Sequence, residues 1–410
     1  MAYIERLADA QLGDALERAG AVLIQGPKAC GKTETASRRA ASIVHVDTDP
    51  TVAPQVSVDP SLVLEGRVPR LLDEWQVQPA LWNAVRRAVD SADGRGQFIL
   101  TGSTAPEVDA VRHSGAGRFA RLQMRTMTLV ESGDSDGTVS LSGLLAGDVP
   151  RSTAPPLDFN GLLKRIAVGG WPGLTGLSDD AASASLRDYV ATIATVDIDA
   201  AGSRRDPSRV LRLMRALARS TATEVTISTL AKDESSLSRD AVREYLDALA
   251  RIFVVEDQPA WSAHLRSSAT LRKEPKRHFT DPSLALALLG ADASALRQSL
   301  PYAGQLFESL AVHDLRVLAQ PLGGEVYHAR DSAGLEVDAI VHLPSGRWAG
   351  FEVKLGSAVE TLDDAAASLR AFADNVEGAD DPVLTIVTGT GPAYRRNDGV
   401  NVVSIGSLGA

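Results

Sequence analysis

The stretch AVLIQGPKACGKTETASRRAAS, residues 21–42, decides how the N-terminal part of the chain folds. It opens with an apolar run that is typical of a buried strand, and it closes with a polar segment that favours a helix. Between them lies GPKACGKT, residues 26–33, in which a glycine, four residues and Gly-Lys-Thr follow the spacing of a phosphate-binding loop. This order predicts an α/β fold with a parallel sheet covered by helices.

The residue types in this loop suit a nucleoside triphosphate. Glycines let backbone N–H groups wrap the phosphates, and the next helix presents its positive end. Lys32 is expected to reach the β- and γ-phosphates, and the Thr33 hydroxyl is expected to ligate Mg²⁺. We therefore predict ATP and magnesium as ligands. The predicted binding residues are Gly26, Pro27, Lys28, Ala29, Cys30, Gly31, Lys32, Thr33 and Glu34.

Cys30 is the only cysteine of the chain, which excludes an internal disulfide. Its position inside the loop predicts that a bulky thiol adduct would block nucleotide binding and that bound ATP would protect the thiol.

A phosphate loop needs acidic and polar partners at the ends of neighbouring strands. RLLDE, residues 70–74, provides Asp73 to hold magnesium and Glu74 to act on the attacking water. QFILTGS, residues 97–103, ends near the same edge, where Thr101 or Ser103 could touch the γ-phosphate or the water. An ordinary turn from strand to loop explains that segment equally well.

Arginines follow in GAGRFARLQMR, residues 115–125. Arg118 could act as an arginine finger that stabilises charge on the γ-phosphate in the transition state. Surface arginines are common, so an ordinary surface role stays open.

The sequence predicts three domains: residues 1–150, an ATPase core; residues 151–285, a helical domain; and residues 286–410, an α/β domain. Residues 131–157 are rich in Gly, Ser, Asp, Thr and Pro, which indicates a loop or domain boundary. Within the middle domain, two short helices and a β-pair follow one another in the order of a winged helix.

Charge is spread unevenly along the chain. The net charge is −10, but residues 201–280 hold 15 Arg and Lys against 10 Asp and Glu, a net of +5, which leaves −15 for the rest. Any site for a polyanion such as DNA is therefore expected in this middle segment. Two basic groups stand out: the helix-spaced Arg205, Arg209, Arg212 and Arg219, and the basic run RKEPKRH, residues 272–278. A solvated helix face is the simpler explanation of the first group.

Residues 336–354 contain Asp338 and, after thirteen intervening residues, Glu352-Val-Lys354. This is the spacing of the PD-(D/E)XK nuclease core. Asp338 and Glu352 would chelate Mg²⁺, Lys354 on the same strand face would orient water, and Glu308 could add a carboxylate. Such folds also serve as scaffolds without cleaving anything, so activity stays open.

The order of these motifs resembles AAA-family ATP-binding proteins of bacteria and archaea that carry a C-terminal domain of unknown function. The resemblance continues through AVGGWPGL (167–174), YVATIATVDID (189–199), RHFTDPSLALALLG (277–290) and GQLFESLAVHDL (304–315). It implies an AAA-type ATPase and a restriction-endonuclease-like C-terminal fold, but no known pathway. Lys28 and Cys30 depart from the residues usual in that family, and no role follows for Asp197 or Asp199.

Composition sets the remaining expectations. Apolar residues make up 44% of the chain, an ordinary globular balance, and no export signal or membrane-spanning run is visible. We expect a cytoplasmic protein that binds ATP and ADP, and an oligomer is compatible with this. Three functions stay open: ATP hydrolysis coupled to nucleic-acid handling, an ATP-dependent switch that docks a protein partner, and an ATP-gated nuclease.

Overall fold

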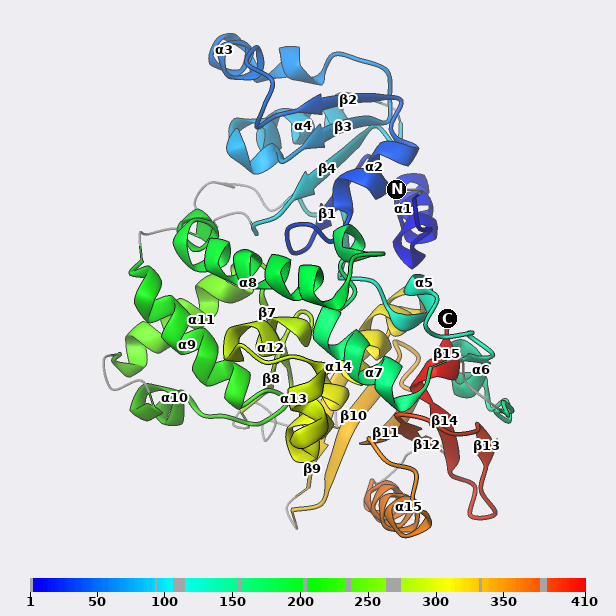
Figure 1. The fold of residues 1–410 in the computed structure, drawn as a ribbon. Coiled ribbons are helices and arrows are strands. Elements are labelled where there is room, and N and C mark those ends of the chain that lie inside the picture. Colours follow the sequence, from blue (N-terminus) through cyan, green and yellow to red (C-terminus); the bar gives the residue numbers. More distant parts are fainter. Residues whose placement is uncertain are drawn as a thin grey trace. The chain divides into compact units, whose positions relative to one another are not determined.

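The computed structural model describes residues 3–92, 94–105, 115–153, 157–201, 205–233, 237–262, 274–331, 334–376 and 382–410. The chain forms two compact units, and each is described here by itself (Figure 1). The first unit contains residues 1–126, 196–205 and 247–254. The second unit contains residues 127–195, 206–246 and 255–410.

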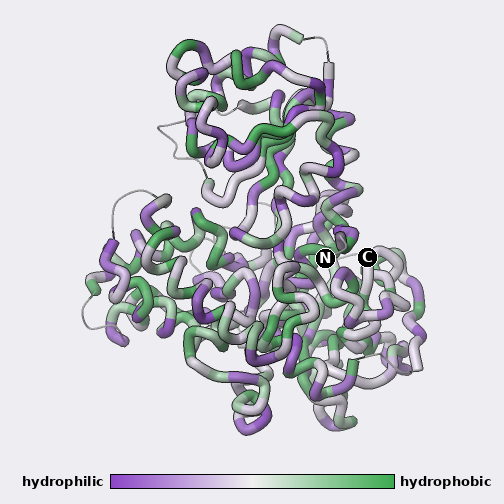
Figure 2. The backbone as a smooth tube through the Cα atoms, turned by 45° about the horizontal axis from the view of Figure 1, so that its top comes forward, coloured by the Kyte–Doolittle hydropathy of each residue, from purple (hydrophilic) through white to green (hydrophobic). Residues whose placement is uncertain are grey.

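The first unit is built on a five-stranded parallel sheet with strand order β2-β3-β4-β1-β5. The strands are β1 (Ala21–Gln25), β2 (Ser42–His45), β3 (Arg70–Asp73), β4 (Phe98–Gly102) and β5 (Phe119–Gln123). All five residues of β1 are buried, as expected for a central strand of a parallel sheet. In Figure 2 the tube is coloured hydrophobic along the strands at the centre of this unit. Because the strands are parallel, their carboxyl ends meet at one edge of the sheet.

Helices cover both faces of this sheet. They are α1 (Leu7–Arg18), α2 (Lys32–Arg39), α3 (Val52–Val58) and α4 (Ala80–Ser91), with the 3₁₀ turns η1 (Pro60–Leu64) and η2 (Trp75–Val77). Successive residues of β1 join different cores: Leu23 packs with residues of α3 and α4, whereas Ile24 packs with residues of α1 and α2. This alternation is the period-two geometry of a strand between two helical layers.

The second unit begins with a segment that the sequence predicted to be a loop or boundary. Residues 127–153 instead contain α5 (Leu129–Ser132), β6 (Val139–Ser140) and α6 (Leu141–Ala146). The strand β15 (Leu408–Gly409) pairs with β6 in parallel. The loop prediction for residues 131–157 was wrong for residues 139–146, because the buried Leu141, Leu144 and Leu145 lie among Gly and Ser residues and gave no long apolar run.

The middle of the second unit is mainly helical, as expected. Its helices are α7 (Phe159–Val168), α8 (Asp179–Thr195), α9 (Pro207–Arg219), α10 (Ile227–Asp233), α11 (Arg239–Arg251, whose last turn belongs to the first unit), α12 (Ser283–Leu289) and α13 (Ala293–Gln298). The 3₁₀ turn η3 (Pro172–Leu174) joins α7 to α8, and η4 (Asp197–Ala201) follows α8. The strands β7 (Val255–Gln258) and β8 (Lys276–Phe279) form an antiparallel pair after α10 and α11. The order of elements is the expected one, and the winged-helix assignment itself stays a prediction.

The C-terminal part contains a six-stranded mixed sheet with order β13-β14-β12-β11-β10-β9. Its strands are β9 (Glu325–Arg330), β10 (Glu336–His342), β11 (Trp348–Lys354), β12 (Val383–Thr388), β13 (Tyr394–Arg395) and β14 (Asn401–Ser404). The long helix α14 (Leu300–Ala319) precedes the sheet, with η6 (Gln320–Leu322) after it. The helix α15 (Val359–Asp374) joins β11 to β12, and η7 (Ile405–Ser407) follows β14. Among the helices that the structure describes, none is both long enough and apolar enough to cross a membrane.

Candidate nucleotide-binding site

The loop GPKACGKT joins the carboxyl end of β1 to α2, which begins at Lys32. Two of its glycines are required by the backbone. A Cβ on Gly26 would lie 2.0 Å from the carbonyl oxygen of Met124, and Gly31 has φ of 102°, a value that side chains disfavour. Ala29 also has a positive φ, 61°. The loop is therefore held tightly against Met124, the residue after β5, and turns sharply into the helix.

Lys32 lies folded over this loop. Its side chain is buried, and Nζ donates hydrogen bonds to the carbonyl oxygens of Gly26 at 3.0 Å and Pro27 at 2.7 Å. The ammonium group thus stays inside the curve of the loop, where a phosphate that entered the loop would meet it.

Asp73, the last residue of β3, gathers polar groups from three other elements. Its Oδ1 accepts hydrogen bonds from Thr33 Oγ1 at 2.8 Å and from Thr101 Oγ1 at 2.5 Å. His45 Nδ1 lies 3.0 Å from the other carboxylate oxygen. The sequence pattern indicated Thr101 as a phosphate contact and gave no sign of His45, because only the pairing of β2, β3 and β4 brings these strand ends together.

The same oxygens suit a magnesium ion. Mg²⁺ prefers hard oxygen ligands and is usually held by one or two carboxylates together with substrate phosphates. The Thr33 hydroxyl and the Asp73 carboxylate converge beside the loop, so these two residues fit the ion and would hold it.

Glu74 stands next to Asp73 in an unusual conformation, with φ of 53°. Ser103 Oγ donates to Glu74 Oε2 at 2.9 Å, Gln76 Nε2 contacts the same oxygen, and the Glu74 N–H donates to Thr101 Oγ1 at 3.2 Å. A non-glycine residue in the left-handed region costs about 1–3 kcal/mol and is concentrated at functional sites. The structure therefore brings Glu74 and Ser103 together, and the carboxylate is held by Gln76 of η2 and by Ser103, which follows β4.

Cys30 differs from the expectation. Its side chain is fully buried in the apolar cluster that contains Leu12 and Ile24, and Sγ lies 3.9 Å from the Met124 carbonyl oxygen. The thiol therefore points into the core and not toward a ligand in the loop. ATP-dependent protection of this thiol is not expected, since the thiol is covered in any case.

Arg118 also differs from the expectation. It precedes β5, whose first residue Phe119 is in register with Ala21 at the amino end of β1. The phosphate loop follows Gln25 at the opposite end, roughly 13 Å or more away along the strand. Arg118 instead pairs with Asp90 at 2.6 Å. The guanidinium of Arg118 is thus at the wrong edge of the sheet to reach a phosphate in the loop of its own chain.

A second polar cluster lies in the second unit, on α14, β8, β10 and β11. It contains the four residues of the nuclease-like motif. Lys354 Nζ lies 2.5 Å from Glu352 Oε2 and 3.8 Å from Asp338 Oδ2, and the N–H of Val353 donates to Asp338 at 2.9 Å. Glu308 joins the cluster through a lysine that the motif does not include.

That lysine is Lys276 of β8. Its Nζ lies 2.6 Å from Glu308 Oε1 and 3.4 Å from Asp338 Oδ1, and only 7% of its side chain is exposed. Burial alone would lower the pKa of Lys276, but Glu308 and Asp338 raise it above its usual value. Burial and the negative charge of Asp338 raise the pKa of Glu308 to about 8 and that of Glu352 to about 7.

Two lysines thus lie among three carboxyl groups. No set of three or more His, Cys, Asp or Glu side chains in the described ranges is arranged to hold a metal ion. An ammonium group between Glu308 and Asp338 offsets the charge that a divalent ion would otherwise offset. In the sequence, Lys276 stands out only as part of the basic run of residues 272–278.

The two basic groups of the middle segment differ in their exposure. In RKEPKRH, Arg272 and Lys273 lie outside the described residues, whereas Lys276 and Arg277 are buried in β8. Arg277 pairs with Asp257 at 2.9 Å. Lys276 and Arg277 are therefore not part of an exposed basic run that could meet a polyanion, because each is buried and paired with an acidic residue of another element.

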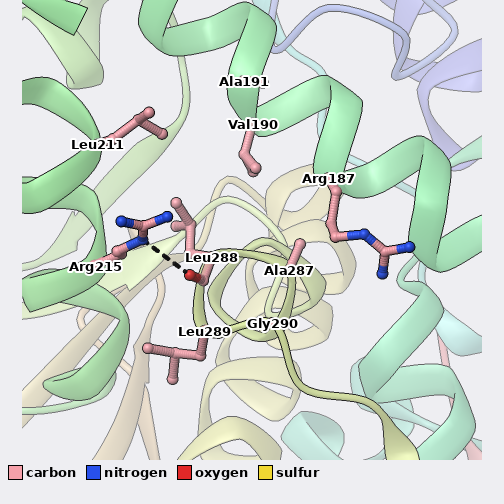
Figure 3. Close-up of a pocket in the computed structure, with 9 residues that line it drawn as sticks. All are labelled: Arg187, Val190, Ala191, Leu211, Arg215, Ala287, Leu288, Leu289 and Gly290. Carbon is pink, nitrogen blue, oxygen red and sulfur yellow. Dashed lines mark hydrogen bonds between the residues drawn. The ribbon is translucent and has the colours of Figure 1, made fainter. Parts of the chain in front are cut away.

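The arginines of α9 largely follow the predicted pattern. Val210, Leu213, Met214 and Leu217 are buried. Of the predicted arginines, Arg209 and Arg219 are exposed and Arg212 is half-buried, and Arg215, which was not predicted, is exposed as well. Arg205 precedes the helix, which begins at Pro207, and so does not share this face. Figure 3 shows Arg215 of α9 and Arg187 of α8 at a pocket of about 470 Å³. Its lining is Arg187, Val190, Ala191, Leu211, Arg215, Ala287, Leu288, Leu289 and Gly290.

Three protein-family models match the chain. An AAA domain matches residues 18–132, the domain of unknown function DUF8612 matches residues 160–295, and the domain of unknown function DUF4143 matches residues 303–408. The first defines the class of protein, and it supports ATP binding and hydrolysis. The AAA-family character expected from the sequence is thereby confirmed.

Two relatives define the family more closely. The chain is 31% identical over 354 residues to the uncharacterized proteins Rv2008c of Mycobacterium tuberculosis and Mb2031c of Mycobacterium bovis. The aligned region covers 85% of this chain and 73% of each relative. The chain therefore belongs to the same family as these mycobacterial proteins.

Similar solved structures include the Walker-type ATPase paby2304 of Pyrococcus abyssi, with a TM-score of 0.42 and 12% identity over 70% of this chain and 96% of that one. The Holliday junction branch migration motor RuvB of Thermotoga maritima matches with a TM-score of 0.28 and 17% identity, over 62% of this chain and 90% of that one. AMPPCP-bound DnaA of Aquifex aeolicus matches with a TM-score of 0.24 and 15% identity, over 61% of this chain and 89% of that one. Scores this low do not establish a common fold over these lengths.

Proposed function

We propose that this protein hydrolyses ATP at the edge of the first unit's sheet, with Lys32 and Thr33 as binding residues and Asp73 and Glu74 as the acidic partners. The observation that carries the proposal is the convergence of Thr33, Thr101 and His45 on the carboxylate of Asp73, directly beside a phosphate-type loop. A solvated acidic pair on a surface has no such set of partners.

Binding depends on the loop and on one charge. The backbone N–H groups that follow Gly26 and the amino end of α2 attract the phosphates. Lys32 exchanges the carbonyl oxygens of Gly26 and Pro27 for β- and γ-phosphate oxygens. Magnesium, when bound, neutralises charge on those oxygens. Thr33 and Asp73 are the residues that would hold it, and Thr101 keeps the Asp73 carboxylate turned toward the loop.

Hydrolysis requires a group that acts on water, and Glu74 is the candidate. The water oxygen bonds to the γ-phosphorus, and the bond from that phosphorus to the β–γ bridging oxygen breaks. Glu74 accepts a water proton, which leaves ADP and inorganic phosphate. Ser103 and Gln76 hold the Glu74 carboxylate in one orientation through Oε2.

Two substitutions separate binding from hydrolysis. Lys32→Ala should abolish tight binding of a fluorescent ATP analogue, because it removes the charge that faces the phosphates. Glu74→Gln should retain binding and stop phosphate release. Hydrolysis by Glu74→Gln at the wild-type rate would refute the role of Glu74, and undiminished binding by Lys32→Ala would refute the site.

A second candidate function is nucleic-acid handling coupled to the ATPase cycle. It is supported by the exposed arginines of α9, by the positive net charge of residues 201–280, and by the order α10, α11, β7, β8, which a winged helix would have. Phosphate contacts from such arginines give affinity without sequence specificity. ATP turnover that rises with added DNA would favour this function. Slow turnover that ignores DNA would favour the protein-docking switch.

Metal-dependent cleavage is the function that the geometry supports least. Lys276 offsets the negative charge of Glu308 and Asp338, and Lys354 that of Glu352. A divalent ion would have to displace a buried ammonium group to bind there. A structural ion-pair cluster accounts for the same residues, with the nuclease-like assignment of residues 286–410 kept as an analogy of fold.

A further inference from the structure

The segment 196–205 belongs to the first unit, although the residues on both sides of it, 127–195 and 206–246, belong to the second. It contains η4, in which Ile198 and Ala201 are buried. This segment joins the first unit from a distant part of the sequence. It is therefore a candidate for a part of the ATP site that lies outside the ATPase motifs.

The contact between this segment and the phosphate loop is an ion pair. Lys28 Nζ lies 2.6 Å from Asp197 Oδ1. The Lys28 side chain is 51% exposed, whereas the Asp197 side chain is 7% exposed. Lys28 lies two residues after Gly26, and the next residue, Ala29, has a positive φ. The pair thus joins a covered carboxylate to the most exposed part of the loop.

The charges of this pair imply a role beyond attaching the segment to the loop. A triphosphate in the loop brings several negative charges close to Asp197, and like charges repel. The Lys28 ammonium is attracted by both, and its side chain is half exposed, whereas that of Lys32 is buried. The phosphate and the Asp197 carboxylate are both negative, and they compete for the one ammonium group. Binding of phosphate and the pairing of Lys28 with Asp197 therefore oppose each other.

We propose that Asp197 is a positioning residue of the ATP site, from which the terminal phosphate of ATP draws the Lys28 ammonium. This rests on the proposed ATP binding at the loop. ADP lacks that phosphate and leaves the pair intact. The segment 196–201 is thereby attached to the loop with ADP and detached from it with ATP, so that its local stability reports which nucleotide is bound.

Hydrogen exchange of the wild-type protein tests this without any substitution. Amides of residues 197–201 should exchange faster with a saturating non-hydrolysable ATP analogue than with ADP, while amides of β1 do not distinguish the two. Nucleotide binding is measured in parallel by fluorescence. Binding with equal exchange in both complexes would overturn the inference alone, and absence of binding would overturn the proposed function as well.

Variants provide a readout that a merely structural role would not change. Asp197→Asn should raise the affinity for ATP relative to ADP by about fivefold, the factor that corresponds to an ion pair with one exposed partner. Asp199→Asn is the matched control, because Asp199 accepts a hydrogen bond from Arg205 N within the same segment. It should leave the ratio of the two affinities unchanged. Equal weakening of ATP and ADP by Asp197→Asn would show that Asp197 only supports the fold.

Discussion

Thr101 Oγ1 donates a hydrogen bond of 2.5 Å to Asp73 Oδ1, the same oxygen that accepts from Thr33. Thr101 is fully buried on β4 and Asp73 ends β3, so the parallel pairing of the two strands fixes the contact. The carboxylate is therefore oriented by a residue that need not touch the nucleotide.

This relationship gives a first prediction. Thr101→Val keeps the shape of the side chain but removes the hydroxyl, so the hydrogen bond to Asp73 and the one from the Glu74 N–H are both lost. The free energy of unfolding should fall by about 1–3 kcal/mol. The magnesium concentration needed for half-maximal ATPase activity should rise, because Asp73 loses its orientation. Thr101→Ser retains the hydroxyl and should behave like the wild type. Equal magnesium dependence in all three proteins would contradict the role given to Thr101.

Gly26 provides a second prediction. An added methyl group would lie 2.0 Å from the Met124 carbonyl oxygen, so Gly26→Ala must displace the loop or β5. We expect a large loss of stability in urea unfolding and loss of nucleotide binding. Gly173→Ala is the control, because nothing lies within 4 Å of its added methyl group and its φ is ordinary. Its stability should stay within about 0.5 kcal/mol of wild type, and an equal effect of the two substitutions would contradict the loop geometry.

The buried lysine of the second unit gives a third prediction. Lys276→Met leaves Glu308 and Asp338 without their nearest positive charge, and breaking a buried ion pair in this way costs about 3–5 kcal/mol. The double variant Lys276→Met/Glu308→Gln should recover part of that loss. Lys232→Met, on the exposed surface of α10, should change the free energy of unfolding little. If the Lys276 and Lys232 variants unfold at the same urea concentration, the cluster does not stabilise the unit.

The fourth prediction concerns DNA. If the exposed arginines of α9 contact phosphates, binding should weaken by roughly 0.9 log unit per log unit of salt for each phosphate neutralised. Reversing the exposed Arg209 and Arg219 to Glu should weaken binding to all sequences alike. Reversing Arg18 and Arg370, which are exposed on α1 and α15, is the control for the same change in net charge. No binding at low salt, or equal weakening by both pairs, would remove the nucleic-acid proposal.

The sequence was informative where chemistry is local. The spacing of GPKACGKT and the apolar strands around it predicted the loop, the parallel sheet and the pairing of Thr33 with Asp73, because neighbouring parallel strands end at the same edge. It was misleading for Arg118, since the edge on which a residue lies depends on strand direction and order, not on motif spacing.

Partners that come from distant segments were not predictable. Lys276 meets Glu308 and Asp338 across 32 and 62 residues, and Lys28 meets Asp197 across 169. A charged residue in a single sequence carries no sign of which opposite charge it will face. Lys276 is buried, and nothing in the surrounding sequence indicated that burial.

The pairing of β6 with β15 has a consequence for synthesis. Ser135, at the start of this region, donates to the carbonyl oxygen of Leu408, 273 residues later in the sequence. At about 5–20 residues per second, a ribosome needs roughly 14 to 55 seconds to cover that interval. During that time the strand Val139–Ser140 has emerged but its partner has not been made, so its open edge is exposed to chaperones and to neighbouring nascent chains. The edge of this strand is thus unpaired during translation, until the C-terminal strand has been made.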